Sequence, residues 1–91
     1  MTFQIPAALR EFSGGRSRVE VEGSCETLSE ALSALWVLCP GIRDRVLTEQ
    51  EQPRQHINIF VGDENIRYTG GLATRVSSES VISIVPAVSG G

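Results

Sequence analysis

The part of this sequence best suited to chemistry is its end, residues 85–91, where a proline is followed by small uncharged residues and two glycines. Gly90 and Gly91 have no side chain that could pack, cap or bind, so the reactive group there is the terminal carboxylate. Glycine backbone can carry that carboxylate into a narrow space. The C-terminus itself is therefore the functional candidate, against the ordinary alternatives of a frayed terminus or a cloning remnant.

The remaining residue types do not assemble an enzyme's active site. His56 is the single histidine, and the sequence pairs it with no serine or cysteine nucleophile. No cluster of histidine, cysteine and carboxylate residues has the spacing of metal ligands. Gly70 and Gly71 lack the lysine and the serine or threonine that follow the glycines of a phosphate-binding loop. A carrier or binding module is therefore favoured over an enzyme, and no metal site is expected.

The composition sets further limits on function. The chain has 91 residues, enough for one domain with a modest core, and a net charge of -3. A nucleic-acid-binding module would show a basic patch, so no nucleic-acid partner is expected. No apolar run approaches the length of a membrane span, and no N-terminal segment has the layout of a signal peptide. We therefore expect a cytoplasmic protein with no membrane partner.

The two cysteines, Cys25 and Cys39, are expected to be free thiols. They flank a predicted helix that holds them farther apart than a disulfide can span. The alternative is a reactive thiol at Cys39, for which the sequence offers no neighbouring base.

The elements that must position the C-terminus begin with a predicted hairpin. Residues 2–5 and 17–22 alternate apolar and polar side chains, which is typical of strands. Pro6 interrupts the first run, residues 7–12 form an extension or a short turn, and the glycines of residues 13–15 indicate a turn.

The clearest local signal predicts a helix over residues 28–39. Thr27 and, three residues later, Glu30 form a capping box, which satisfies the free amide groups of a helix start. Trp36 is expected at the rim of the core. The apolar residues of this helix recur on one face, at Leu28, Ala31, Leu32, Leu35 and Cys39.

The segment after this helix is expected to carry little regular structure. Pro40 and Gly41 predict the end of the helix. A short helical turn at residues 46–47 and then a solvated loop to Pro53 are expected, because this segment is polar and charged.

Two further strands, residues 56–61 and 80–85, complete the predicted sheet, and Pro86 is expected to end the second of them. Residues 62–65 are predicted to form a tight turn, and residues 66–68 to begin a short return strand. The strand residues expected to face the core are Ile57, Ile59, Val61, Ile82 and Ile84.

The opposite sheet face is predicted to carry an apolar patch. Phe60 projects away from the core by strand alternation, and Val81 and Val85 share its side of the sheet. Apolar patches of this kind often mark partner sites. The order of elements predicts an α+β fold, a mixed sheet with one main helix packed on one face.

These features together resemble the ubiquitin-like β-grasp family, and within it the sulfur-carrier proteins of the molybdopterin synthase small-subunit and thiamin sulfur-carrier type. The resemblance is strongest over residues 58–74 and resumes over residues 81–91. The segments RYTGGLAT, starting at Arg67, and PAVSGG, starting at Pro86, are most similar to the CysO-type carrier that serves a cysteine synthase. The resemblance implies a β-grasp domain over residues 1–85 and a flexible tail over 86–91.

The resemblance also implies a chemistry for the terminus. In such carriers an E1-like enzyme adenylates the terminal glycine with ATP, and sulfur then replaces an oxygen to give a thiocarboxylate. By this resemblance Gly91 holds the thiocarboxylate and Gly90 clears its path. ATP would be bound by the activating enzyme, so the chain is expected to bind no cofactor and to serve as a co-substrate.

Several partners follow from the same resemblance. They are an E1-like adenylating or sulfurtransferase enzyme, a sulfur-accepting synthase of the cysteine synthase or molybdopterin synthase large-subunit type, and a metalloprotease that releases the product. The family carries a hydrophobic sheet patch for partners, which Phe60 and Val85 match by strand register. The residues expected to contact partners are Phe60, Val81, Val85, Pro86, Ala87, Val88 and Ser89.

Three functions of the chain remain open from the sequence. The first is sulfur donation in the biosynthesis of cysteine, molybdopterin or another sulfur-containing metabolite. The second is a protein modifier joined through Gly91 to lysine side chains. The third is a plain interaction domain with an inert tail. The tail lacks an arginine of the kind ubiquitin has, which disfavours activation by a ubiquitin-type enzyme.

Overall fold

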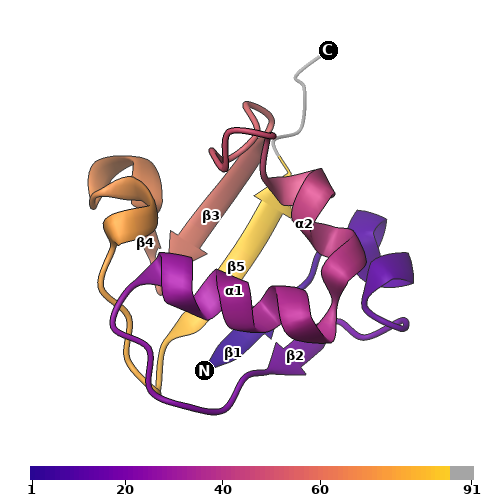
Figure 1. Cartoon of the computed structure of the whole chain (residues 1–91), viewed down its shortest axis with the longest axis horizontal. Coiled ribbons are helices and arrows are strands. Elements are labelled where there is room, and N and C mark those ends of the chain that lie inside the picture. The colour runs from indigo at the N-terminus through magenta and orange to yellow at the C-terminus, as the bar shows by residue number, and fades with distance from the viewer. Residues whose placement is uncertain (87–91) are drawn as a thin grey trace.

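A mixed five-stranded sheet with a helical layer on one face makes up the fold, as the computed structural model shows for residues 1–86, the part that it describes (Figure 1). The strands are β1 (Thr2–Gln4), β2 (Arg18–Glu20), β3 (Ile57–Val61), β4 (Glu64–Asn65) and β5 (Val81–Pro86). The α-helices are α1 (Leu28–Leu38) and α2 (Pro40–Val46), and the 3-10 helices are η1 (Ala7–Phe12), η2 (Ile66–Tyr68) and η3 (Gly71–Ala73). The predicted α+β arrangement is confirmed.

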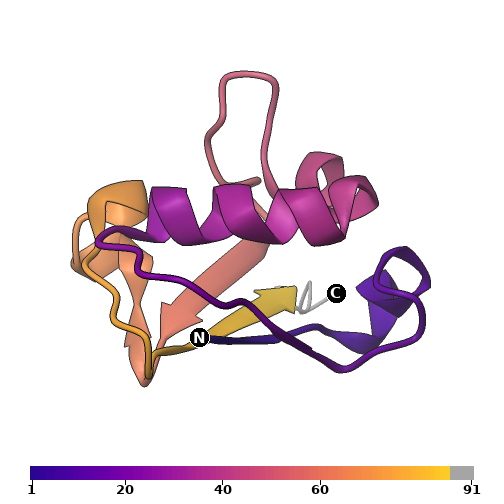
Figure 2. The ribbon, with the colours of Figure 1, turned by 60° about the horizontal axis from the view of Figure 1, so that its bottom comes forward.

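The strand order is β2-β1-β5-β3-β4, with β5 at the centre. β1 pairs in parallel with β5, and the other pairs are antiparallel, including the predicted hairpin of β1 and β2. Because β1 and β5 come from opposite ends of the chain, the last strand is held between the first strand and β3. The α-helices α1 and α2 lie over one face of this sheet, and no helix or strand of residues 1–86 covers the other face (Figure 2).

The capping box predicted for α1 is present. The Thr27 hydroxyl accepts from the Glu30 backbone amide at 3.4 Å, and the Glu30 carboxylate accepts from the Thr27 amide at 3.2 Å. The predicted apolar face is buried along the whole helix. Trp36 is half-buried at the rim, as predicted.

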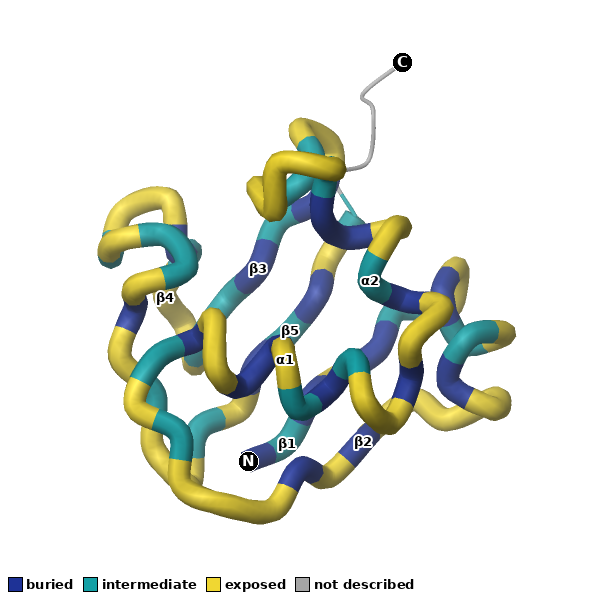
Figure 3. Tube along the Cα trace, viewed as in Figure 1, coloured by how far each residue is buried: buried dark blue, intermediate teal, exposed yellow. Residues whose placement is uncertain are grey.

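The core lies between α1 and the sheet. Buried positions alternate with less buried ones along β3 and β5, as strand geometry requires (Figure 3). Ile59 is 1% exposed and Ile82 0%, so the predicted register of both strands is confirmed. Val61, also predicted to be in the core, is only partly buried and packs against its edge.

The segment after α1 differs from the prediction. α1 ends at Leu38, but Pro40 and Gly41 then begin α2, which the sequence analysis reduced to one turn at residues 46–47. Proline suits this position, because the first turn of a helix needs no amide hydrogen from it and its φ is already helical. Ile42 and Val46 are buried, so α2 contributes to the core.

The predicted return strand at residues 66–68 is wrong. These residues form η2, in which the Asn65 side chain accepts from the Arg67 backbone amide at 3.0 Å and so caps the turn. The return strand is β4, inside the segment predicted as a turn. The chain reverses already at Gly62, whose φ of 61° favours glycine, so Phe60 lies opposite Asn65.

Smaller differences concern element ends. Residues 7–12, predicted as an extension or a short turn, form the 3-10 helix η1, and β2 is confined to Arg18–Glu20. His56 precedes β3 instead of belonging to it. Within residues 1–86, no helix combines the length and apolarity needed to cross a bilayer.

Candidate functional site

The base of the C-terminal stretch is the end of β5. Pro86 is the last residue of that strand and lies opposite Ile57 in the ladder, one residue beyond the predicted end of the strand. Pro86, from which the C-terminal stretch continues, is therefore held at the end of the central strand, beside the start of β3 (Figure 1). The predicted site residues Ala87, Val88, Ser89, Gly90 and Gly91 lie outside the described residues.

The predicted apolar patch lies on the uncovered sheet face. Val81 is 39% exposed and Val85 42%, while Phe60 is half-buried. Phe60 stands directly opposite Ser83, which places it diagonal to both valines. We call Phe60, Val81 and Val85 the sheet patch. Their placement agrees with the sequence analysis, and their role in partner binding remains a prediction.

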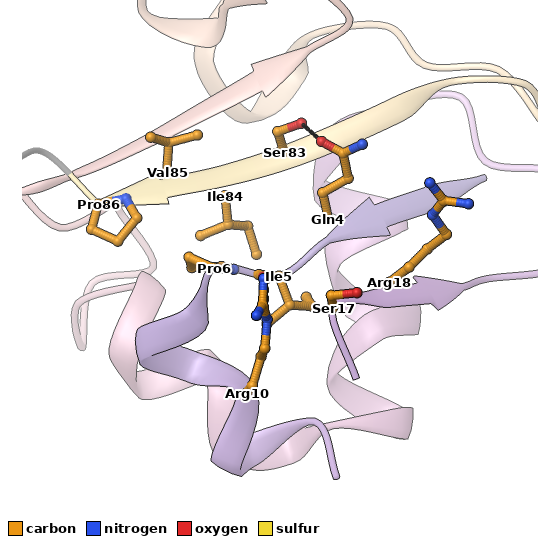
Figure 4. A pocket seen from close by; sticks show the side chains of 10 residues that line it. All are labelled: Gln4, Ile5, Pro6, Arg10, Ser17, Arg18, Ser83, Ile84, Val85 and Pro86. Carbon is orange, nitrogen blue, oxygen red and sulfur yellow. Dashed lines mark hydrogen bonds between the residues drawn. The ribbon is translucent and has the colours of Figure 1, made fainter. Parts of the chain in front are cut away.

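A hollow of about 390 Å³ lies next to the sheet patch, where β1 gives way to η1 while β5 continues, paired only with β3 (Figure 4). Ile5, Pro6, Val85 and Pro86 contribute apolar surface to it. Pro6 turns the chain away from β5 after only three paired residues, which leaves this space beside the end of β5. The hollow therefore borders Pro86, the residue from which the C-terminal stretch continues.

Two arginines from different elements also line this hollow. Arg10 rises from η1 and Arg18 projects from β2, on either side of Ile5 (Figure 4). We call this feature the Arg10–Arg18 hollow. Neither arginine belongs to the site residues predicted from the sequence. The signal in the sequence is weak, since Arg18 lies on the outward face of an alternating strand, whereas Arg10 lies in a segment predicted only as an extension or a short turn.

The two cysteines and the histidine, which the sequence offered as candidates for reactive groups, show no arrangement for catalysis among the described residues. Cys39 is buried and Cys25 half-buried, and both are free thiols, as predicted. His56 is exposed. Among residues 1–86, no three histidine, cysteine or acidic side chains gather as a metal site.

The second pair of glycines belongs to a tight turn. Gly70 has a φ of 111°, a conformation that glycine adopts readily. The Thr74 hydroxyl donates to the Gly71 carbonyl at 2.6 Å and lies 2.9 Å from the Thr69 hydroxyl. Thr74 is buried, so these bonds satisfy its side chain and hold η2 and η3 together.

Comparison with known proteins gives a consistent family match. The model of the ThiS family matches residues 3–91. The sulfur carrier protein CysO of Mycobacterium tuberculosis is 37% identical over 93 residues, covering 100% of this chain and 98% of the relative. The small archaeal modifier protein 1 of Haloferax volcanii is 34% identical over 92 residues, covering 100% of both chains.

Solved structures agree with these matches. The crystal structure of the Amycolatopsis orientalis BexX/CysO complex contains a chain that superposes with a TM-score of 0.87 at 37% identity. The match covers 99% of this chain and 98% of that one. The likeness therefore extends over the whole fold as well as over the sequence.

Proposed function

This chain belongs to the ThiS family and is a sulfur carrier of the ThiS/CysO type, and on that premise we propose that Gly91 carries the sulfur as a C-terminal thiocarboxylate. The ubiquitin-like β-grasp fold and the carrier family, both inferred from the sequence, are confirmed. A carrier of this family is not an enzyme, also as predicted.

The proposed activation has two steps. A carboxylate oxygen of Gly91 attacks the α-phosphorus of ATP, pyrophosphate leaves, and an acyl adenylate forms. Hydrosulfide then attacks the carbonyl carbon, AMP leaves, and the thiocarboxylate remains after loss of one proton. The adenylate is needed because a free carboxylate is a poor electrophile. ATP is held by the activating enzyme, and the carrier contributes the reacting carboxylate.

The observation that carries this proposal is the place where the described fold ends, at Pro86. Pro86 ends the central strand, and five small uncharged residues follow it. Five residues of extended chain span at most about 18 Å. A partner can therefore bind the rigid sheet and still receive the Gly91 carboxylate in an active site below its own surface, with Gly90 leaving room for that approach.

The proposed partners are an E1-like activating enzyme and a sulfur-accepting synthase. The solved complex of a CysO protein with BexX supports a carrier that docks on a partner protein. The similarity to CysO favours cysteine as the sulfur product, with molybdopterin or another metabolite as alternatives. If the product stays attached to Gly91, a metalloprotease would release it.

The proposal is tested by incubating the protein with its activating enzyme, ATP and sulfide, followed by intact-protein mass spectrometry. Wild type should exchange one oxygen for one sulfur. Deleting Gly91 moves the carboxylate back by about 3.5 Å. Since a misplacement of about 1 Å can cost a hundredfold in rate, this variant should gain no sulfur.

Two results would contradict the assignment to Gly91. One is equal sulfur incorporation into the truncated chain, and the other is sulfur that fragment spectra map to Cys25 or Cys39. A chain with one residue added after Gly91 is the matched control, because it keeps both glycines but blocks the carboxylate. It should bind the activating enzyme and remain unmodified.

A second function is supported by the relative in Haloferax volcanii, whose name describes a small archaeal modifier protein. The same adenylate could pass to a lysine side chain of another protein, with loss of AMP and formation of an isopeptide bond. Covalent adducts ending at Gly91 in cell extract would favour this function. A free thiocarboxylate without adducts would favour the carrier.

A further inference from the structure

The Arg10–Arg18 hollow has an unusual charge for this protein. The chain has a net charge of -3. The hollow beside Pro86 is nevertheless lined by two arginines and by no aspartate or glutamate of the described residues. The nearest acid along β2 is Glu20, whose carboxylate accepts from the Thr2 hydroxyl at 2.9 Å. The hollow is therefore a local positive site on an acidic molecule.

Within residues 1–86, neither arginine forms an ion pair. The ion pairs among residues 1–86 involve Arg43 and Arg75, and none includes Arg10 or Arg18. Arg10 uses its Nε to donate to the Ile5 carbonyl at 3.2 Å, which orients the guanidinium and leaves its Nη groups available. Arg18 is exposed. A guanidinium has five N–H donors and no acceptor, so both side chains can take an anionic ligand.

The neighbouring polar side chains reinforce this preference. The Ser83 hydroxyl donates to the Gln4 side-chain carbonyl at 2.8 Å, which uses one of the two lone pairs of that oxygen and orients the amide (Figure 4). The amide NH₂ of Gln4 remains as a donor at the rim. A site that offers donors from Gln4, Arg10 and Arg18 beside an apolar wall suits a carboxylate on an otherwise apolar protein surface.

We propose that the Arg10–Arg18 hollow binds an acidic side chain of the enzyme that activates the C-terminus, an inference that rests on the proposed carrier function. Val85 belongs both to the hollow and to the sheet patch, so one partner surface can cover both. Pairing of unlike charges fixes the orientation of a complex and raises its rate of association. A protein carboxylate is favoured over a polyanion, because the net charge of the chain is negative.

The position of the hollow restricts where this acidic residue lies on the enzyme. Pro86 lines the hollow, and the chain from Pro86 to the Gly91 carboxylate spans at most about 18 Å. The acidic residue should therefore lie on the enzyme surface no farther from the α-phosphate of ATP than this reach plus the width of the hollow.

The test measures the dissociation constant of the cognate activating enzyme without ATP, so that binding is separated from activation. The double variant Arg10→Gln/Arg18→Gln is compared with Arg67→Gln/Arg75→Gln, which removes the same charge outside the hollow. We expect about a tenfold or greater rise in the dissociation constant for the first pair only. Raising the salt concentration should weaken wild-type binding towards that of the hollow variant.

Two outcomes would overturn the proposal: a hollow variant that binds within about twofold of wild type, or a control pair that loses as much affinity. If circular dichroism shows that the double variant is unfolded, the single variant Arg18→Gln is compared with wild type in the same binding assay. Arg18 is exposed, and its side chain forms no hydrogen bond in the described fold that the substitution would break. Failure of wild type to acquire sulfur would instead count against the carrier function. The two failures are therefore distinguishable.

Discussion

At the scale of the residue, two phenylalanines show that the alternation of a strand decides whether a side chain lies in the core or on the surface. Phe3 of β1 is 0% exposed and belongs to the core. Phe60 of β3 faces the uncovered side, opposite Ser83 and diagonal to Val81 and Val85. An aromatic ring within such a patch is a frequent anchor of protein interfaces.

Replacing Phe60 by aspartate should weaken binding of the activating enzyme by about 2 kcal/mol or more, because an interface anchor is lost and a charge is placed within the patch. Calorimetric titration would measure the affinity. Val37→Asp is the matched control, since Val37 is 82% exposed on the helical layer. The prediction fails if both variants bind alike, and unfolding of the Phe60 variant by circular dichroism would indicate a core role.

At the scale of the element, α1 owes its starting point to a local exchange of hydrogen bonds. Thr27 and Glu30 satisfy each other's backbone amides, and Leu28 is the first buried residue of the helix. The Thr27 backbone also forms an isolated bridge with Arg75, and the Leu28 amide donates to the Thr74 carbonyl at 2.8 Å. The cap thus joins the helix to the segment that leads into β5.

Thr27→Ala should lower the free energy of unfolding by about 1 kcal/mol, since it removes the side-chain acceptor of the helix start. Urea denaturation followed by circular dichroism would measure this change. Ser29→Ala is the control, because Ser29 is exposed within the helix and alanine favours helices, so stability should hold or rise slightly. Equal stability of wild type and Thr27→Ala would contradict the capping role.

At the scale of the whole molecule, the chain is poorly suited to accept its own activated terminus. All eight basic side chains are arginines, and the sequence contains no lysine. The amino group of Met1 donates to the Val21 carbonyl at 3.1 Å and the Ser78 carbonyl at 2.8 Å, and Met1 is 8% exposed. An acyl adenylate on Gly91 therefore meets no lysine on a second copy, and the amino group of Met1 is engaged in these two hydrogen bonds.

This composition predicts that activation with ATP produces no covalent multimers of the chain, whether it serves as a sulfur carrier or as a modifier. Denaturing electrophoresis and intact mass after incubation with the activating enzyme would measure multimers. Arg75→Lys supplies an amine at a side chain that is 78% exposed, and this variant should form dimers more readily. Multimers of wild type would show that another group accepts the acyl chain.

The sequence by itself determined the features that depend on neighbours along the chain. The capping box at Thr27, the buried face of α1 and the alternation of β3 and β5 were predictable, because each arises from residues a few positions apart. The terminal glycines were likewise visible in the sequence. Local signals also misled where two structures compete, as at Pro40, which begins α2, and at Asn65, whose side chain favours η2 over a longer strand.

Only the tertiary structure decided which distant residues share a surface. Thr2 pairs with Val81 across nearly the whole chain, and this parallel pairing holds the last strand at the centre of the sheet. The antiparallel pairing of Gln4 with Arg18 and the turn of the chain at Pro6 then bring Arg18 and Arg10 beside β5. No local pattern encodes that meeting, because contacts between the ends of a chain form only when the whole hydrophobic core selects one strand order.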